Sequence, residues 1–215
     1  MEEILKKYSL LIDQNVSRET FLDFENFIIM LKEKNEEINI ISKETAKNSV
    51  IRERHIVDSA QIIEFVDLNS DIITDIGSGG GMPGIIISIM IKNLKNSSKV
   101  HLYEKSHYKS LFLRKVSRDL KLNTKIIQEN IFEAQNLQSG TIMARAFKPL
   151  PVVLDLVYKN FSSCKNLIMF MGKNGEKILE ETLKSWEFNF VKKKSITNKD
   201  SFLLNIKDIK KKIKN

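Results

Sequence analysis

A glycine-rich stretch, DIGSGGGMPG at residues 75–84, carries the residue types best suited to binding a small charged ligand. An apolar run at residues 71–77 predicts a buried strand before it, and Pro83 opens the apolar segment behind it, as proline does at the first position of a helix. Glycines allow sharp turns and close approach to a ligand, and α/β proteins bind ligands at such strand-to-helix corners. The stretch holds more glycine than a structural turn requires, so we expect a ligand-binding loop.

Two cofactor classes are compatible with this loop. From Gly79 the residues satisfy G-x-G-x-x-G, which is typical of dinucleotide-binding proteins. From Asp75 they satisfy acidic-x-G-x-G-x-G, a pattern that resembles the loop of class I S-adenosylmethionine-dependent methyltransferases. A carboxylate at Asp75 would attract the cationic end of the methionine moiety but would oppose a pyrophosphate. The sequence therefore favours S-adenosylmethionine over NAD, with Asp75, Gly79 and Gly81 as candidate contacts.

Further cofactor candidates follow the ends of later predicted strands. Glu104 ends the strand predicted at residues 100–105, where a carboxylate can accept hydrogen bonds from both ribose hydroxyls; a surface glutamate beside Lys105 is the alternative. Ile131 and Phe132 follow the third predicted strand and would flank an adenine, although ordinary core packing explains them equally well.

The elements that must position these residues alternate between strand and helix after residue 67. The first 66 residues predict helices over Glu3–Ile12, from an N-cap at Ser17 to about Glu37, and from about Thr45 to Phe65. Predicted strands follow at residues 71–77, 100–105, 124–128, 141–144 and 166–172, and two more at 188–197 and 201–207 form an antiparallel hairpin.

This order predicts an α/β fold: a doubly wound, Rossmann-like class I methyltransferase whose seven-stranded, mostly parallel sheet ends in that hairpin. We divide the chain into an N-terminal helical extension (1–66), a methyltransferase domain (67–207) and a basic C-terminal tail (208–215).

Composition excludes several other classes of protein. The single cysteine, Cys164, excludes a disulfide scaffold and a cysteine-rich zinc cluster, and three scattered histidines argue against a metal centre. The start MEEILKKYSLLI does not resemble a signal peptide, and the longest apolar run is too short to cross a bilayer, so we expect a cytoplasmic protein with no membrane partner. The net charge is +8, and residues 192–215 hold nine lysines against two aspartates. These lysines reflect either AT-rich coding bias or a surface that faces a polyanion.

Several motifs taken together resemble one family. They are RHIVDSA (54–60), DIGSGGGMPGI (75–85), LYEKSHYKSLFLR (102–114), RAFKPL (145–150) and Lys173 after the fifth predicted strand. The chain is similar in these segments to the RsmG family, also called GidB, of bacterial 16S rRNA guanine-N7 methyltransferases. It departs from the family where Lys173-Asn174-Gly175 replaces a Lys-Gly pair and where Ser201 stands near the position of an arginine.

The resemblance implies both cofactor and substrate. S-adenosylmethionine would donate a methyl group to N7 of a guanine in the 530 loop of 16S rRNA, within naked rRNA or a small-subunit assembly intermediate, and would leave as S-adenosylhomocysteine. The implied cofactor contacts are Gly77, Met82, Ile131 with Phe132, and Arg145. We expect a monomer. A methyltransferase for another RNA or a small molecule is the alternative; an NAD-dependent dehydrogenase or a non-catalytic RNA-binding protein is less favoured.

The chemistry requires few catalytic groups, because guanine N7 has an exposed lone pair and needs no general base. Arg145, at the end of the fourth predicted strand, would orient the guanine and cofactor, or else form a structural salt bridge. The remaining candidates for RNA contacts are Arg54, His55, Lys109, Phe147 and Lys173, although packing is the more common role for a histidine like His55 and explains Phe147 at least as well. Arg54 and Asp58 stand one helical turn apart, which also predicts an ion pair between them.

Overall fold

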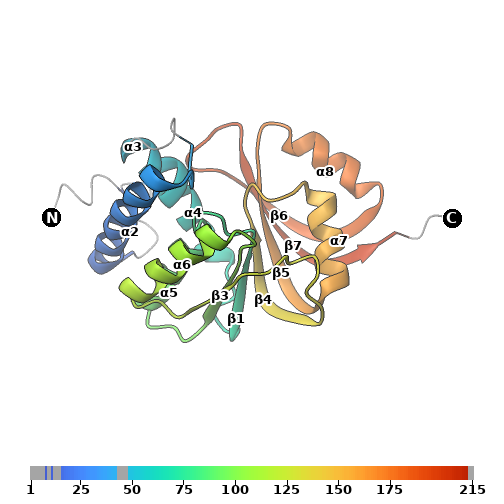
Figure 1. Ribbon diagram of the computed structural model, residues 1–215. Coiled ribbons are helices and arrows are strands. Elements are labelled where there is room, and N and C mark those ends of the chain that lie inside the picture. The colour runs from blue at the N-terminus through green and yellow to red at the C-terminus, as the bar shows by residue number, and fades with distance from the viewer. Residues whose placement is uncertain (1–7, 9–10, 12–15, 43–47, 213–215) are drawn as a thin grey trace.

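The computed structural model describes residues 8, 11, 16–42 and 48–212, which form a seven-stranded sheet with helices on both faces (Figure 1). The strands lie in the order β3-β2-β1-β4-β5-β7-β6. Strands β1 to β5 are mutually parallel, whereas β7 runs antiparallel to both neighbours, so the predicted sheet and terminal hairpin are confirmed. The strands are β1 Ile72–Ile76, β2 Lys99–Tyr103, β3 Thr124–Ile127, β4 Leu137–Ala144, β5 Phe161–Met171, β6 Trp186–Lys194 and β7 Phe202–Lys211.

Two hydrophobic cores lie on the two faces of the sheet. Successive strand residues point to opposite faces, so Met143 packs with the core under α2, α5 and α6 while its neighbour Ile142 packs with the core under α7 and α8. The helices that cover the sheet are α2 Arg18–Glu37, α5 Gly84–Asn93, α6 His107–Asp119, α7 Leu150–Asn160 and α8 Gly175–Leu183.

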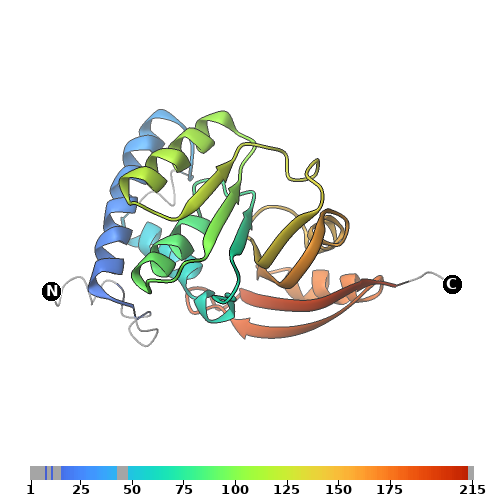
Figure 2. The same ribbon diagram turned by 90° about the horizontal axis from the view of Figure 1, so that it is seen from below.

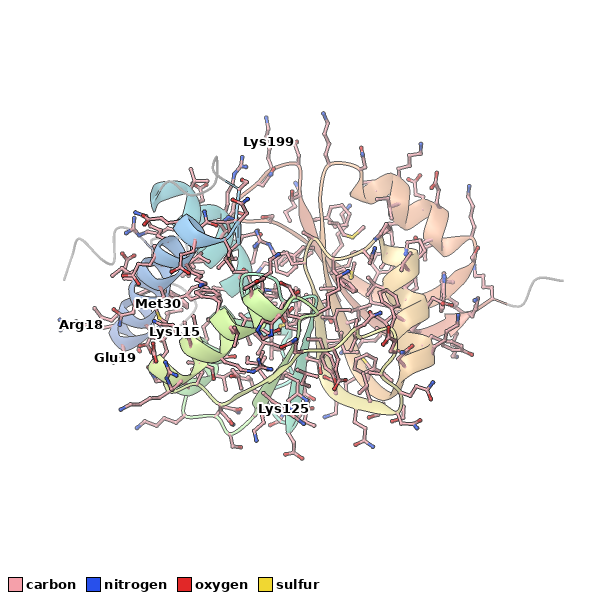
Figure 3. All side chains as sticks on the ribbon, viewed as in Figure 1. Arg18, Glu19, Met30, Lys115, Lys125 and Lys199 are labelled. Atoms are coloured by element: carbon pink, nitrogen blue, oxygen red, sulfur yellow. The ribbon has the colours of Figure 1, made fainter. Side chains whose placement is uncertain are left out.

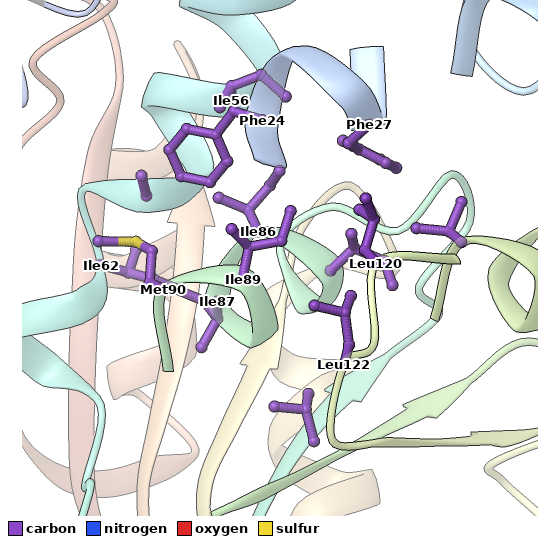
Figure 4. Close-up of a cluster of buried hydrophobic side chains, with 14 of the residues drawn as sticks. Phe24, Phe27, Ile56, Ile62, Ile86, Ile87, Ile89, Met90, Leu120 and Leu122 are labelled. Carbon is purple, nitrogen blue, oxygen red and sulfur yellow. The ribbon is translucent and has the colours of Figure 1, made fainter. Parts of the chain in front are cut away.

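Helix α2 packs directly on α5, which covers one face of the sheet. The Ser17 hydroxyl accepts a hydrogen bond from the Thr20 amide at 3.3 Å, which confirms the predicted N-cap. Phe24 and Phe27 of α2 are fully buried in the same cluster as Ile86 and Ile89 of α5 (Figure 4). The N-terminal helical region therefore shares a core with one face of the sheet. The helix predicted over Glu3–Ile12 lies outside the described residues, apart from positions 8 and 11.

The prediction of one regular helix from about Thr45 to Phe65 is wrong for the middle of that segment. Of its described part, α3 (Asn48–Ile51) leads into a π-helical turn, η3 (Arg52–Val57), followed by α4 (Asp58–Ala60) and a 3₁₀ turn, η4 (Ile63–Phe65). A π-helical turn bonds residues five apart and shifts the side chains that follow it around the axis. Residues four apart across η3 therefore no longer share the face that regular spacing predicts.

Other boundaries differ by a few residues. Helix α5 begins at Gly84, one residue after Pro83, and β7 continues to Lys211. Because β7 is antiparallel, Phe202 lies opposite Met171 at the carboxyl edge of the parallel strands, and the residues after Ile206 continue toward the opposite edge, where β7 pairs with β6 but no longer with β5. Figure 2 shows this hairpin reaching away from the helices toward the C-terminus.

Candidate functional site

The glycine loop between β1 and α5 is shaped by three left-handed backbone positions. Gly77, Gly79 and Gly81 have φ angles of +72°, +55° and +94°, which side chains adopt only with strain. The Gly77 amide donates to the Tyr103 carbonyl at 3.0 Å, and the Gly79 amide donates to Glu104 Oε2 at 2.8 Å. The loop is thus tied to the end of β2.

The Asp75 side chain lies on the side of this loop that faces the protein interior. Its side chain is buried, and Oδ2 accepts a hydrogen bond from the Gly84 amide at 3.0 Å, at the start of α5. A Cβ atom on Gly84 would lie 2.5 Å from Oδ2, so a glycine is required there. Burial raises the pKa of Asp75 to about 7, and Oδ1 has no hydrogen-bond partner. Asp75 supports the loop and does not line the adjoining cavity.

A cavity of about 630 Å³ opens beside the loop at the carboxyl edge of the sheet. Its size suits a cofactor, since ligand pockets commonly measure about 300–1,000 Å³. The structure brings together here most of the residues that the sequence singles out: Gly77, Gly79, Met82, Glu104, Ile131 and Arg145 from the cofactor set, and His55, Lys109 and Phe147 from the RNA set.

The other candidates lie elsewhere. Gly81 faces the protein interior, where an added Cβ would lie 2.6 Å from Ile85. Phe132 is 42% exposed and stacks on Phe147 with ring centroids 5.8 Å apart, so it touches the wall of the cavity from outside. Arg54 lines a second cavity, and Lys173 is an exposed side chain that lines neither.

Glu104 holds the loop with both of its carboxylate oxygens. Oε2 accepts from the Gly79 amide, and Oε1 accepts from the Ser106 amide at 2.7 Å. A carboxylate has about four acceptor positions, so two backbone bonds leave capacity for further donors such as hydroxyl groups. Glu104 is 8% exposed and lines the cavity, where that capacity is accessible.

Arg145 forms the centre of a polar cluster between α4 and the end of β4. Its guanidinium pairs with Asp58 at 2.9 Å, contacts His55 Nδ1 at 3.4 Å and donates to the Arg54 carbonyl. It also lies over the Phe170 ring, 5.6 Å from the centroid. Burial lowers the pKa of Arg145 while the Asp58 charge raises it, and the group remains a cation at neutral pH.

The ion pair expected between Arg54 and Asp58 is therefore wrong: Asp58 pairs with Arg145 instead. Both residues border on or lie within the π-helical turn, where the i,i+4 spacing of a regular helix no longer applies. A buried guanidinium from β4 takes the carboxylate, and Arg54 contributes its backbone carbonyl to the same guanidinium.

His55 is uncharged at neutral pH. Burial, together with the positive charges of Arg145 and Arg54, lowers its pKa to about 4. Its Nε2 atom is buried without a hydrogen-bond partner. A neutral imidazole can accept from the Arg145 guanidinium at Nδ1 and adds no positive charge at the cavity wall.

A second cavity, of about 830 Å³, lies on the other side of Arg145. The two cavities share Arg145 and Ala146, and the lining of the second also includes Arg54, Asp58, Phe170 and most of the β6–β7 loop, residues 195–201. Lys199 marks this loop among the carboxyl-edge loops in Figure 3. The arrangement provides two adjoining binding spaces with one cation in the wall between them.

Sequence reasoning missed three features of this site. Asp58 is visible within RHIVDSA, but its partner lies 87 positions along the chain, beyond any local pattern. The β6–β7 loop reads as a short polar turn, and its proximity to Arg145 follows only from the position of β7 beside β5. Ala146, with φ of +50°, is a non-glycine residue in the left-handed region, which no composition signal indicates.

The part of the chain that the structure describes lacks two features that are typical of other classes of protein. No group of three or more His, Cys, Asp or Glu side chains there is placed to hold a metal ion. Nor do those residues include a helix long and apolar enough to cross a membrane.

Comparison with known proteins gives consistent matches. A family model described as GidB, rRNA small subunit methyltransferase G, matches residues 20–205. A relative from Pelagibacter ubique, named ribosomal RNA small subunit methyltransferase G, is 80% identical over 99% of this chain and 100% of its own length. One of the same name from Rickettsia rickettsii is 32% identical over 92% of this chain and 99% of its own. The solved structure of a SAM-dependent methyltransferase from Aquifex aeolicus shares the fold with a TM-score of 0.55 at 13% identity, over 81% of this chain and 97% of that one.

Proposed function

The chain belongs to the GidB family, the ribosomal RNA small subunit methyltransferases G, and we propose that it methylates N7 of a guanine in the 530 loop of 16S rRNA with S-adenosylmethionine as donor. The observation that carries this proposal is the pair of adjoining cavities that share Arg145. Methyl transfer needs donor and acceptor on two sides of one point, and these cavities meet at such a point.

The residues of the first cavity fit the proposed cofactor. Gly77 and Gly79 keep the loop free of side chains, Glu104 retains acceptor capacity for the ribose hydroxyls, and Ile131 offers an apolar surface for the adenine. Asp75 adds negative charge behind the loop, on the side of the proposed methionine moiety, when it is ionised. Bound there, S-adenosylmethionine would supply an electrophilic sulfonium methyl group.

The chain itself contributes orientation and electrostatics to this reaction. N7 attacks with its own lone pair, so the neutral His55 is not needed as a base. Positive charge develops on the purine during transfer, and an unpaired cation beside it would oppose the reaction. The Asp58 carboxylate, 2.9 Å from Arg145, offsets the guanidinium charge while leaving its directed N–H groups available.

We propose that the second cavity receives the acceptor guanine and that nearby cations contact the RNA backbone. Arg54 lines this cavity, Lys173 lies beside its rim after Gly172, and Lys109 lies at the mouth of the first. The substrate is 16S rRNA or a small-subunit assembly intermediate, and the enzyme acts in the cytoplasm as a monomer.

The test combines cofactor binding with mapping of the product. Calorimetric titration should show binding of S-adenosylmethionine and S-adenosylhomocysteine but not of NAD. Incubation with labelled cofactor and ribosomal particles from a strain that lacks the enzyme should place one label on N7 of a guanine in 16S rRNA. Label on another RNA would support the alternative, a methyltransferase that acts on a different RNA. Binding of NAD would contradict the proposed cofactor and with it the proposed function.

A further inference from the structure

The carboxylate that pairs with Arg145 is itself held by residues from a distant part of the chain. Asp58 Oδ1 accepts hydrogen bonds from Gln61 Nε2 at 2.8 Å, from Thr197 Oγ1 at 2.8 Å and from Ser195 Oγ at 3.3 Å, while Oδ2 faces Arg145. Two of these donors belong to the β6–β7 loop. The carboxylate therefore has more partners than an ion pair alone provides.

A further hydrogen bond joins the loop to Gln61, the residue after α4, and another joins two residues within the loop. The Ile196 amide donates to Gln61 Oε1 at 3.0 Å, and the Thr197 amide donates to Ser195 Oγ at 3.2 Å. Gln61 thus binds Asp58 with its amide nitrogen and the loop with its amide oxygen. This arrangement fixes the position of the loop relative to Asp58.

We propose that Asp58 is a positioning residue for methyl transfer: the hydroxyls of Thr197 and Ser195 fix its carboxylate, which holds the Arg145 guanidinium in the wall between the two cavities. This inference rests on the proposed function, because it assigns to Arg145 a place between donor and acceptor. It adds the β6–β7 loop to the machinery of the reaction, although that loop need not touch the transferred methyl group.

The guanidinium of Arg145 has space to move into either cavity, so a fixed carboxylate is needed to hold it in place. The side chains of Arg145 and Asp58 are 18% and 14% exposed, and space is available to the guanidinium on both sides. Without Asp58, its remaining polar contacts are the neutral His55 nitrogen and the Arg54 carbonyl. Neutral acceptors hold a guanidinium more weakly than a carboxylate does, so the side chain would turn into either cavity.

The position of Arg145 can be measured without any substrate, through the titration of His55 followed by NMR. The protein has three histidines, which simplifies assignment. The pKa of His55 is lowered to about 4 by burial and by Arg145 and Arg54, the charged groups that act on it. In Asp58→Asn the guanidinium should leave His55, and the pKa should rise. Asp67→Asn, which removes a carboxylate paired with Lys165 instead, is the matched control and should leave His55 unchanged.

Transfer kinetics test the consequence for the reaction. With saturating cofactor and ribosomal substrate, Asp58→Asn should slow single-turnover transfer by roughly 10- to 100-fold, the effect expected when a hydrogen bond to a charged group is lost. Thr197→Ala should slow it by a smaller factor, and Thr197→Ser, which keeps the hydroxyl, should restore the parental rate. Ser162→Ala removes an exposed hydroxyl on β5 that lines neither of the two cavities, and we expect no effect on the transfer rate.

The outcomes separate this inference from the function on which it rests. If parental protein methylates no guanine of 16S rRNA, the proposed function fails, while the His55 titration still reports on Arg145. If methylation occurs but Asp58→Asn leaves both the His55 pKa and the transfer rate unchanged, the positioning role is overturned. Equal losses in Thr197→Ala and Thr197→Ser would also overturn it, because the hydroxyl would then be irrelevant.

Discussion

Replacement of Gly77 by alanine tests the wall between the glycine loop and the proposed cofactor cavity. The φ angle of +72° costs an L-residue about 1–2 kcal/mol. A Cβ atom would also lie 2.2 Å from Cδ2 of Phe147, whereas carbon atoms approach favourably only to about 3.5–4.0 Å. The ring must therefore move by more than an ångström. The added carbon meets Phe147 first, so it would act on the cofactor through that ring.

The backbone strain at residue 77 and the displacement of the Phe147 ring affect different measurements. Backbone strain is present with and without ligand, so it lowers stability, by about 2–8 °C in Tm for a chain of this length. Displacement of Phe147 disturbs its stacking on Phe132, worth about 0.5–1.5 kcal/mol, and the wall of the cavity that it lines. We expect affinity for S-adenosylhomocysteine to fall by about tenfold or more, because 1.4 kcal/mol corresponds to a factor of ten.

Calorimetric titration and thermal unfolding of four variants separate these effects. The double variant Gly77→Ala, Phe147→Ala should bind the cofactor as Phe147→Ala does, because the clash is gone, yet keep the loss in Tm. Gly172→Ala is the control, since nothing lies within 4 Å of its added Cβ. Parental affinity in Gly77→Ala would refute the assignment of Phe147 to the cofactor wall.

Three further results are expected. Arg145→Lys should slow single-turnover transfer by roughly 10- to 100-fold, since an ammonium cannot reproduce the directed bonds of the guanidinium; a near-parental rate would return Arg145 to a structural role. Because the pKa of Asp75 is raised from about 4 when unfolded to about 7, its contribution to stability is present at low pH and lost as pH rises between these values. In denaturant titrations, the unfolding free energy of Asp75→Asn should therefore increase relative to that of the parent as pH rises across this window. A difference between the two proteins that does not change with pH would contradict the raised pKa. The double variant Arg54→Gln, Lys173→Gln should reduce the slope of log K for RNA binding against log salt concentration by roughly 0.7–0.9 per lost phosphate contact. Glutamines at positions 210–212 should leave that slope unchanged. The reverse result in filter-binding assays would place the RNA surface on the hairpin.

The sequence predicts well whatever depends on neighbouring residues. The Ser17 cap, the loop of left-handed glycines and the alternation of strands and helices all follow from local patterns, and the structure confirms them. Met82 and Ile131 line the first cavity because each follows a strand or loop that ends at the carboxyl edge, as the topology requires.

What the sequence could not supply is contact between distant segments. Asp58 has an obvious local candidate in Arg54, and only packing shows that Arg145 is nearer. The π-helical turn leaves no mark in the hydrophobic pattern, because it displaces side chains without changing their type. Thr197 likewise acquires its bond to Asp58 from the antiparallel return of β7, not from anything in its own surroundings.

The position of β6 at the end of the sheet gives some of the basic residues a role that involves neither RNA nor coding bias. The backbone groups along the outer edge of β6 are open to pairing with a strand of another molecule. Three consecutive lysines, residues 192–194, occupy this edge. Lys192 contacts Glu176 and Lys193 contacts Glu64, while Lys194 remains exposed. Lysine side chains on an edge strand disfavour its pairing with the edge of another sheet, and this role of the lysines does not depend on RNA.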